Sequence, residues 1–443
     1  MGFCLLPGLS SAITVNTVAE LVQAVEQVNS GGDKEILLED GIYTLNSAIV
    51  IQSDGITVRS VSGNRSAVKV QGTGMDGTVS HIFLVQADNF TATDMTLGNV
   101  YYHAIQMQPS AQTPTMINLH VFDTYEQMIK VAYDPGNPDV HSDNGLVENC
   151  LFEYIAGIGP QYYIGGVDAH HARNWIVRGN TFKNIRSPSQ QLAEHAIHFW
   201  NNSQNTLVER NTIINCDRGV GFGLGYQGHE GGIIRNNMIY HDSSEGFADV
   251  GIGLESAPDA QVYNNSIYQE HTYPNAIEYR FTTTTGVIIS NNLTNKAIAG
   301  RDGASATCSN NITNAGTTWF ANLPTGDLHL LSPVPAVVDQ GLFITGLDDD
   351  IDRDIRPQGG GYDIGADEYV FLGLCPDCSG DVVIIDNATF TSGATCECLG
   401  ATSITIGPEV VIQSGATVTF NAPIVKVSPG FRAENGSTVY MRQ

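Results

Sequence analysis

Apolar residues at helical spacing occur in one clear stretch, near the start of the chain. Residues 17–28 predict an amphipathic helix whose apolar side consists of Leu21, Val22, Ala24, Val25 and Val28. The next segments, 35–44 and 49–58, alternate apolar and polar residues and are broken by glycine turns, which is typical of short strands. We expect the helix to cover the open end of a stack of strands, where it prevents pairing with another chain.

A seven-residue strand-like pattern then returns at roughly constant spacing. It occupies residues 146–152, 176–182, 207–213, 233–239, 261–267, 288–294 and 307–313. The fifth position of each copy is Cys150, Asn180, Asn211, Asn237, Asn265, Asn292 and Asn311, in steps of 30, 31, 26, 28, 27 and 19 residues. A strand-rich repeat of this period predicts the coils of a β-solenoid.

The asparagines of this repeat have a structural interpretation. Asparagine tolerates the left-handed backbone conformation that a tight corner needs, and its amide can bond to the next asparagine along a stack. We therefore expect a ladder of side-chain amides along the solenoid axis, with no part in chemistry.

Several of these features together resemble a known superfamily. The N-terminal helix, the Asp40–Tyr43 turn, the stretch Ser62–Ala67 and the asparagine-rich coils resemble right-handed parallel β-helix proteins of the pectate-lyase-like superfamily. The resemblance covers residues 13–330 and implies an all-β, right-handed, single-stranded parallel β-helix with an N-terminal capping helix. It does not specify an activity, because the superfamily contains lyases, hydrolases, epimerases and adhesins without enzymatic activity.

Composition narrows the classes of partner. The 443 residues carry a formal net charge of −26, and no basic stripe is visible that could replace phosphate counterions, so we expect no nucleic-acid partner. The sequence contains no apolar run of about 18 residues, so we expect no transmembrane segment. Residues 1–12 either resemble the tail of a signal peptide or are an irregular leading segment. We expect a secreted, extracellular protein.

The character of the chain changes near residue 331. Residues 331–372 resemble the closing segment of bacterial surface β-helices, and their clustered aspartates, 348–354, either hold Ca²⁺ or form a solvated acidic loop. Residues 373–443 alternate apolar and polar positions between turns and predict a second, small β-stack. This module resembles C-terminal sorting or surface-attachment modules, which implies attachment to a cell surface.

The cysteines form two groups besides Cys4. We expect free, buried thiols at Cys150, Cys216 and Cys308, which occur singly within strand-like segments. The second group is Cys375, Cys378, Cys396 and Cys398. Four such thiolates suit zinc, whereas two disulfides fit an exported protein better, so we expect two disulfides of undetermined pairing.

The strands before the asparagine corners can be aligned on their inward apolar positions, Val167, Ile197, Val220, Val250 and Ile277. The first outward column is then Asp168, His198, Gly221, Gly251 and Glu278, with Lys130 one coil earlier. The second outward column is His170, Trp200, Gly223, Gly253 and Arg280. Two coils with only glycine would form the bare floor of a trough between polar walls, which suits a chain of sugar rings. Alternatively, the glycines only relieve crowding on a flat sheet.

Distances along the stack separate types of reaction. Coils about 4.8 Å apart place Asp168 and Glu278 about 19 Å apart, too far for the carboxylate pair of a glycosidase. Asp168 and His198 are one coil apart, so the carboxylate can orient the imidazole. We expect His198 to abstract the proton α to a uronate carboxylate, while Arg280, His170 or bound Ca²⁺ neutralises the developing charge.

The remaining candidates are expected to bind substrate. Besides the four glycines, these are Trp200, Glu278, Lys130, Glu194, Glu255 and Arg218. His103 and His195, each followed by Ala-Ile, are interpreted as structural residues bonded to the backbone, and His171 and His229 are placed on loops. The sequence thus favours a lyase or epimerase acting on a uronate-containing polysaccharide. Its rivals are a polysaccharide-binding or surface-structural protein without turnover, and a hydrolase with carboxylates outside these columns.

Overall fold

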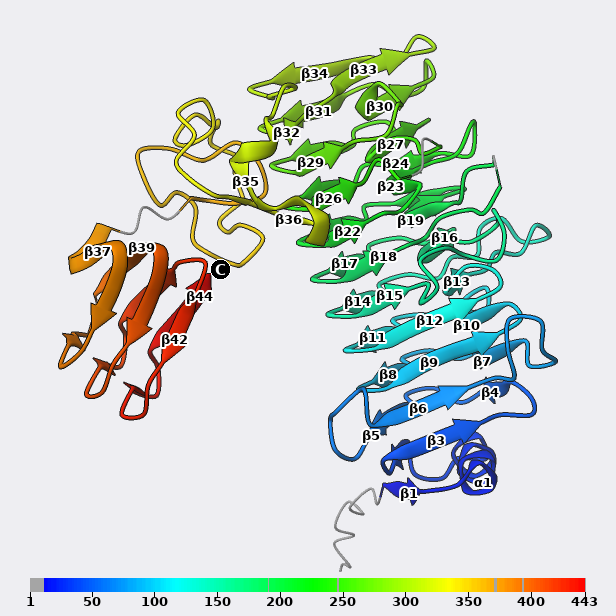
Figure 1. Ribbon diagram of the computed structural model, residues 1–443. Coiled ribbons are helices and arrows are strands. Elements are labelled where there is room, and N and C mark those ends of the chain that lie inside the picture. Colours follow the sequence, from blue (N-terminus) through cyan, green and yellow to red (C-terminus); the bar gives the residue numbers. More distant parts are fainter. Residues whose placement is uncertain (1–11, 190, 245–246, 370–372, 393, 443) are drawn as a thin grey trace, which may run out of the picture. The chain divides into compact units, whose positions relative to one another are not determined.

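The computed structural model describes residues 12–189, 191–244, 247–369, 373–392 and 394–442. Contacts divide the chain into two compact units, 1–369 and 370–443. In the first unit three parallel sheets run along the stack, and successive strands of the chain pass from one sheet to the next (Figure 1). The fold is a right-handed parallel β-helix, as the sequence predicts.

The ten-stranded sheet that carries the candidate residues is called the site sheet. Its strands are β4 (Ile49–Ile51), β7 (His81–Val85), β10 (His103–Met107), β13 (Ile129–Val131), β16 (Val167–His170), β19 (His195–Trp200), β23 (Arg218–Phe222), β27 (Ile252–Glu255), β30 (Asn275–Arg280) and β33 (Ala297–Arg301). Its inward apolar side chains lie in the core. This part of the sequence folds into strands because β-branched and aromatic residues alternate with residues that tolerate an outward position.

Two further parallel sheets complete the coils. The twelve-stranded sheet contains β1 (Ile13–Val15), β2 (Glu35–Leu38), β5 (Thr57–Ser60), β8 (Thr91–Thr93), β11 (Thr115–Ile117), β14 (Leu146–Glu148), β17 (Ile176–Arg178), β21 (Leu207–Glu209), β25 (Ile233–Arg235), β28 (Gln261–Tyr263), β31 (Val287–Ser290) and β34 (Ala306–Ser309). The third sheet contains β3 (Gly41–Thr44), β6 (Val68–Gln71), β9 (Thr96–Val100), β12 (His120–Thr124), β15 (Leu151–Glu153), β18 (Thr181–Lys183), β22 (Thr212–Ile214), β26 (Met238–His241), β29 (Ser266–Gln269) and β32 (Leu293–Thr294).

Helix α1 (Val18–Asn29) caps the first coils, as predicted. It buries Leu21, Ala24, Val25 and Val28. The Thr17 hydroxyl accepts a hydrogen bond from the backbone N–H of Glu20 (3.2 Å) and so caps the first turn. Val22 is a correction to the predicted apolar face: it is 41% exposed, because it faces away from the coil that the helix covers.

The predicted asparagine ladder is present at the corner between the twelve-stranded and the third sheet. Each side-chain carbonyl accepts hydrogen bonds from the coil before it, for example from the backbone and side-chain N–H groups of Asn180 to Asn211 Oδ1, both at 3.0 Å. The left-handed residue, however, is the one before the ladder position. These residues are Asn149, Gly179, Arg210, Asn236, Asn264, Asn291 and Asn310. Turn and ladder therefore use two adjacent residues, where the sequence interpretation assigned both to one.

The segment after the last coil packs against the outer face of the third sheet. Strands β35 (Phe320–Asn322) and β36 (Asp327–Leu330) pair antiparallel, and Leu328 and Leu330 share an apolar cluster with Tyr240 and Tyr268. Within the clustered aspartates, the Asp350 carboxylate is buried and accepts backbone N–H groups of Asp352 and Asp354. Asp350 thus shapes its own loop instead of lying in solvent, and Ca²⁺ there stays a prediction.

The second unit is a small β-stack with its own core. Its main sheet contains β37 (Gly373–Ile385), β39 (Thr395–Ile406), β41 (Thr417–Asn421), β42 (Val425–Val427) and β44 (Thr438–Arg442), and its second sheet contains β38 (Thr389–Phe390), β40 (Val411–Ile412) and β43 (Arg432–Ala433). Within both sheets the pairings are parallel. The apolar residues that alternate along these strands form the buried cluster.

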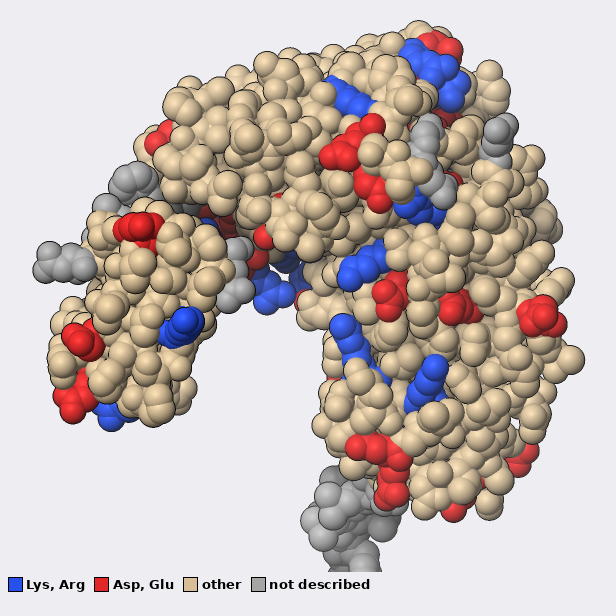
Figure 2. Space-filling model, in the orientation of Figure 1, with Lys and Arg blue, Asp and Glu red and all other residues tan. Residues whose placement is uncertain are grey.

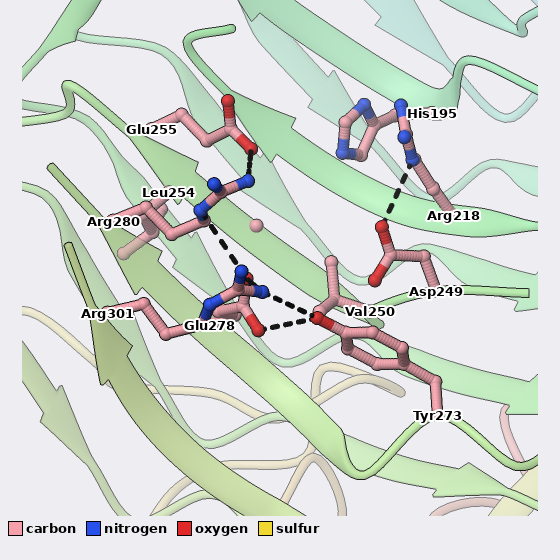
Figure 3. Close-up of a pocket in the computed structure, with 11 residues that line it drawn as sticks. His195, Arg218, Asp249, Val250, Leu254, Glu255, Tyr273, Glu278, Arg280 and Arg301 are labelled. Carbon is pink, nitrogen blue, oxygen red and sulfur yellow. Dashed lines mark hydrogen bonds and ion pairs between the residues drawn. The ribbon is translucent and has the colours of Figure 1, made fainter. Parts of the chain in front are cut away.

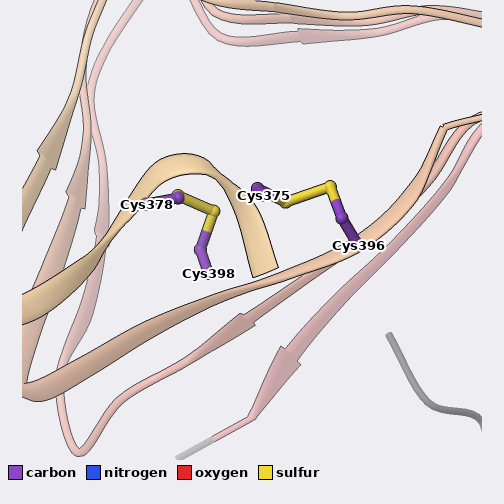
Figure 4. Close-up of a disulfide and its surroundings, with 4 residues drawn as sticks. All are labelled: Cys375, Cys378, Cys396 and Cys398. Carbon is purple, nitrogen blue, oxygen red and sulfur yellow. A yellow bond between two sulfur atoms is a disulfide. The ribbon is translucent and has the colours of Figure 1, made fainter. Parts of the chain in front are cut away.

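Two disulfides join the first two long strands of this unit, as expected (Figure 4). They connect Cys375 to Cys396 and Cys378 to Cys398, so each links β37 to β39. Cys150 and Cys216 are free and buried, as predicted. Cys308 is free but exposed, because β34 is the last strand of its sheet and no further coil covers it.

Candidate active site

The site sheet pairs most of the predicted columns in the expected register. Lys130, Asp168, His198 and Gly221 are consecutive partners in the first outward column. The next partner is Gly253 rather than Gly251, because Ile252 and not Val250 pairs with Val220. Glu278 follows Gly253.

The same shift corrects the second outward column. His170 pairs with Trp200, but Glu255 pairs with Arg280, where the sequence alignment placed Gly253. Gly251 lies before β27, and Gly223 lies just after β23 with φ of +77°. An added Cβ at Gly223 would lie 1.7 Å from the Glu255 carbonyl oxygen, so this glycine is required by the backbone of the next coil.

A closed polar cluster lies over β13, β16 and β19. We define it as Lys130, Asp168, His170 and Trp200. The ammonium of Lys130 bonds to Asp168 and also contacts His170 Nε2 (2.9 Å). The Trp200 indole N–H donates to Asp168 Oδ1 (2.7 Å). The aspartate is only 2% exposed, so its charge depends on these partners.

The pKa values in the closed cluster follow from burial and this pairing. Burial alone would raise the pKa of Asp168, but the Lys130 charge beside it holds that pKa well below its usual range. Burial lowers the pKa of His170 to about 3. The cluster therefore holds one ion pair and a neutral imidazole, with most of their polar atoms already bonded within the protein.

His198 lies beside Asp168 as predicted, one coil away, but solvent does not reach it. Its exposure is 0%. The His195 ring lies 4.5 Å from its ring centroid, and Trp200 stacks on it at 5.3 Å and 5°. His198 Nε2 lies 3.2 Å from the Gly223 carbonyl oxygen. Enclosed in this way, His198 cannot touch a substrate carbon, so the role of general base predicted for it does not fit the structure.

The glycine floor is also covered. An added Cβ at Gly221 would lie 2.7 Å from carbon atoms of the His195 ring, and one at Gly253 would lie 3.4 Å from His195 Nε2. These glycines therefore make room for an imidazole instead of leaving a bare trough. His103 is bonded to the backbone as predicted, through Nδ1 to the Gln127 carbonyl (2.7 Å), whereas His195 Nδ1 has no hydrogen bond among the described residues.

His171 and His229, which the sequence interpretation placed on loops, are also buried. His171 has a left-handed backbone at the end of β16, with φ of +46°. His229 belongs to β24 (His229–Glu230), and its ring stacks on Phe222 at 3.9 Å. His171 therefore lies in a loop as predicted, although it is buried, whereas His229 belongs to a short strand.

An open pocket of about 240 Å³ lies farther along the same sheet (Figure 3). It is lined by His195, Arg218, Asp249, Val250, Gly253, Leu254, Glu255, Tyr273, Glu278, Arg280 and Arg301. Figure 3 shows Arg280 and Arg301 on one side, opposite Asp249 and Tyr273. The pocket gathers five of the predicted residues, namely Arg218, Gly253, Glu255, Glu278 and Arg280.

Charges of both signs meet in this pocket. Arg301 Nη1 bonds to Glu278 Oε1 (2.9 Å), and the Tyr273 hydroxyl donates to Glu278 Oε2 (2.7 Å). Arg280 contacts Glu255 at 3.1 Å. On the other side, Arg218 Nε lies 3.5 Å from Asp249 Oδ2. Figure 2 shows that acidic and basic side chains are also interspersed on the outer surface, in contrast to the strongly negative sum for the whole chain.

Two pKa values in the pocket are shifted in the direction useful for acid and base chemistry. Burial raises the pKa of the Asp249 carboxyl, and the nearby Arg218 charge opposes this rise. Burial, followed by the hydrogen bond to Glu278, raises the pKa of Tyr273 to about 12. At neutral pH Tyr273 is therefore a protonated donor, and Asp249 is a stronger base than an exposed carboxylate.

The sequence interpretation missed four polar pocket residues. Arg301 could have been found by extending the second outward column one coil beyond Arg280, with which it pairs. His195 was assigned a structural role by analogy with His103. Asp249 and Tyr273 precede β27 and β30 in connections without repeat pattern, so no spacing pointed to them. The other predicted residues, Glu194 and Gly251 among them, do not line the pocket.

Comparisons with known proteins find similar chains among solved structures. No protein family and no curated protein is matched by the sequence. Among solved structures, pectate lyase Pel9A is 15% identical, with 81% of this chain and 97% of that chain covered at a TM-score of 0.49. The alginate lyase from Paenibacillus sp. str. FPU-7 is also 15% identical, with 60% and 97% covered at 0.41.

The Dettilon tailspike protein is 14% identical, with 96% of this chain and 65% of that chain covered at a TM-score of 0.44. At this level of identity the likeness concerns the fold. Among the described residues there is no helix of the length and apolar character needed to cross a membrane.

Proposed function

We propose that this protein is an extracellular, carbohydrate-active β-helix protein that acts on a uronate-containing polysaccharide by β-elimination in the open pocket. The observation that carries the proposal is the pocket itself, where three guanidinium groups line one concave site on a chain of net charge −26. Guanidinium groups bind carboxylates through paired N–H donors, so these three groups offer contacts to an acidic sugar, beside the pocket's own carboxylates of Asp249, Glu255 and Glu278.

The pocket side chains can be assigned to the steps of elimination. Arg280 and Arg301 face the open space and would hold the uronate carboxylate, which stabilises the negative charge that forms when the α proton leaves. Asp249, with its raised pKa, would take that proton. The C–O bond to the neighbouring sugar then breaks as the C=C bond forms, and Tyr273 would donate a proton to the departing oxygen. Return of a proton to the opposite face would give epimerisation instead.

The base in this proposal replaces His198. A general base must come within hydrogen-bond reach of the proton that it abstracts, and the enclosure of His198 by His195 and Trp200 prevents this. Asp168, Lys130 and His170 would then support the sheet from within the closed cluster. The extracellular location is supported by the two disulfides of the second unit, which persist in oxidising compartments. Attachment to a cell surface through that unit stays a prediction.

Hydrolysis is the second candidate, favoured by one observation. Asp249 shares the pocket with Glu255 and Glu278, and the Glu278 charge contributes to its raised pKa. A carboxyl group kept protonated beside an ionised one is the arrangement that glycosidases use. Asp249 also lies outside the two predicted columns, as that alternative required.

The decisive experiment measures the ultraviolet absorbance of unsaturated uronate on a panel of polygalacturonate, alginate and glycosaminoglycans, with and without EDTA. We expect absorbance to rise with one of these polymers and to be lost in Asp249→Asn, whose carboxamide cannot accept the proton. Absorbance that survives this substitution would remove Asp249 as base. New reducing ends without absorbance would favour hydrolysis, and polymer retention without any product would favour a binding protein.

A further inference from the structure

Three potential metal ligands converge at the start of β19. They are Glu194, which precedes the strand, and His195 and His198 on the strand itself. One ring nitrogen of each histidine and a carboxylate oxygen of the glutamate all lie within 4.8 Å of one another. Two imidazoles and a carboxylate form a donor set that zinc and related divalent ions bind in proteins.

The polar atoms at this place are buried and have no hydrogen bonds. Nδ1 of His195, Nδ1 of His198 and Oε2 of Glu194 all lack a hydrogen-bond partner among the described residues. The side chain of His198 is fully enclosed, and His195 is 6% exposed. A buried polar atom without a partner costs about 1–3 kcal/mol, so these three atoms, on side chains whose ligand atoms converge, call for a partner.

The second nitrogen of His198 is positioned as in a metal-bound imidazole. Its Nε2 lies 3.2 Å from the Gly223 carbonyl oxygen, which can only accept a hydrogen bond. Nε2 therefore carries the proton, and Nδ1 presents its lone pair to the cluster. A ligand histidine usually donates its other N–H to a carbonyl or carboxylate in this way.

The competing explanation is a His198 cation held between Asp168 and Glu194. Its Nδ1 lies 3.4 Å from Asp168 Oδ1 and 3.6 Å from Glu194 Oε2, and it forms a hydrogen bond with neither. Asp168 is already bonded to Lys130 and Trp200. A cation at His198 would also leave Nδ1 of His195 unsatisfied.

A second trio among the described residues differs in its close ion pairs, although His329 Nε2 likewise has no hydrogen bond. His329, Asp352 and Asp367 also bring ligand atoms within 4.8 Å. There, however, the ring nitrogens of His329 are paired with Asp327 at 2.5 Å and with Asp352 at 2.8 Å. The protein itself thus supplies partners for this imidazole, and the trio serves as a control.

We propose that Glu194, His195 and His198 bind one divalent first-row transition-metal ion, with Zn²⁺ as the reference ion. Bond lengths of about 2.0–2.2 Å require the three ligand atoms to draw together, which the partly exposed Glu194 side chain permits. Ca²⁺ is disfavoured because it takes six to eight oxygen ligands. Since His195 also lines the open pocket, the ion would lie at the wall of that pocket.

The test is metal binding, and it does not depend on any sugar chemistry. The full chain is dialysed against a chelator, and Zn²⁺ binding is followed by calorimetry and Co²⁺ binding by its visible absorbance. We expect one ion per chain, and at least about tenfold weaker binding in Glu194→Gln, which keeps the shape of the side chain. His329→Gln should bind as the unchanged protein does.

Two results would overturn the proposal. One is no saturable binding of Zn²⁺ or Co²⁺ by the unchanged chain. The other is undiminished Zn²⁺ or Co²⁺ binding by Glu194→Gln, whether or not His329→Gln loses that binding. His198→Gln removes a second ligand, but that variant need not fold. Glu194→Gln still decides the test in that case, because its partly exposed carboxamide can be solvated. Its unfolding transition can be compared with that of the unchanged protein. Metal binding without polysaccharide cleavage would support this inference and leave the proposed function unsupported.

Discussion

The closed cluster and the open pocket use the same face of the same sheet in opposite ways. Both include charged side chains from the two outward columns, yet Asp168 is 2% exposed, whereas the Arg301 side chain is 45% exposed. In the closed cluster the polar atoms are mostly bonded to one another. In the pocket, guanidinium groups keep donors for a ligand. The comparison shows that a position in an outward column determines which way a side chain points, but not whether solvent or a ligand can reach it.

Acid should produce the largest effect, because the coils hold other buried neutral histidines like His170. Burial lowers the pKa of His103, His229 and His271 to about 3 and that of His241 to about 4. Between these values and about 6.5 the unfolded chain binds more protons than the folded one. The contribution of these histidines to stability is therefore full above about pH 6.5 and is lost as the pH is lowered toward 3.

This acid transition can be followed by circular dichroism at a series of pH values. Asp350 and Asp363, whose pKa values burial raises to about 7, act in the opposite direction because their folded forms hold protons that the unfolded chain releases. They are fewer than the four histidines. Stability that stays level down to pH 4 would contradict the assignment of neutral histidines to the core.

Within the closed cluster, Lys130→Met should cost about 3–5 kcal/mol in the free energy of unfolding. The substitution leaves the buried Asp168 charge without its cation. Chemical denaturation measures the change, and Lys183→Met on β18, where the lysine is only half-buried, serves as the control with a small effect. Equal losses in the two variants would mean that the cluster is not a buried ion pair.

In the open pocket, Arg280→Gln should weaken binding of a uronate oligosaccharide by about tenfold to a hundredfold, because a charge-assisted hydrogen bond contributes about 1.5–3 kcal/mol. Stability should change by less than about 1 kcal/mol, since its close partners Glu255 and Asp302 are partly solvated and the buried Glu278 keeps its bonds to Arg301 and Tyr273. Calorimetry with a charged and a neutral oligosaccharide separates the two effects. An equal loss of affinity for both sugars would argue against recognition of the carboxylate.

The boundary between the two regions can be tested with two glycines. Gly221→Ala places a methyl group 2.7 Å from the His195 ring and should destabilise by about 1–3 kcal/mol. Gly253→Ala places its methyl group 3.2 Å from Val250 and 3.4 Å from His195, so its effect should be smaller. Thermal unfolding of the pair provides the measurement, and the reverse order would mean that His195 does not lie over Gly221.

The sequence predicted the fold and most of the register because both depend on the alternation of inward and outward residues. It failed at β27 for a physical reason: Val250, Ile252 and Leu254 are all apolar, so a shift of two residues leaves the same face buried. Only the length of the coil decides between the two alignments. The enclosure of His198 and the pocket positions of Asp249 and Tyr273 depend on tertiary packing, which periodicity does not encode.

The asparagine ladder gives the solenoid a built-in polarity. Each amide takes hydrogen bonds on its oxygen from the preceding coil and donates from its nitrogen toward the following one, from Asn180 through Asn292 to Asn311. The amide dipoles therefore line up head to tail, and each bond polarises the next. The two ends of the ladder are therefore not equivalent, because all of its amide-to-amide hydrogen bonds run in the same direction.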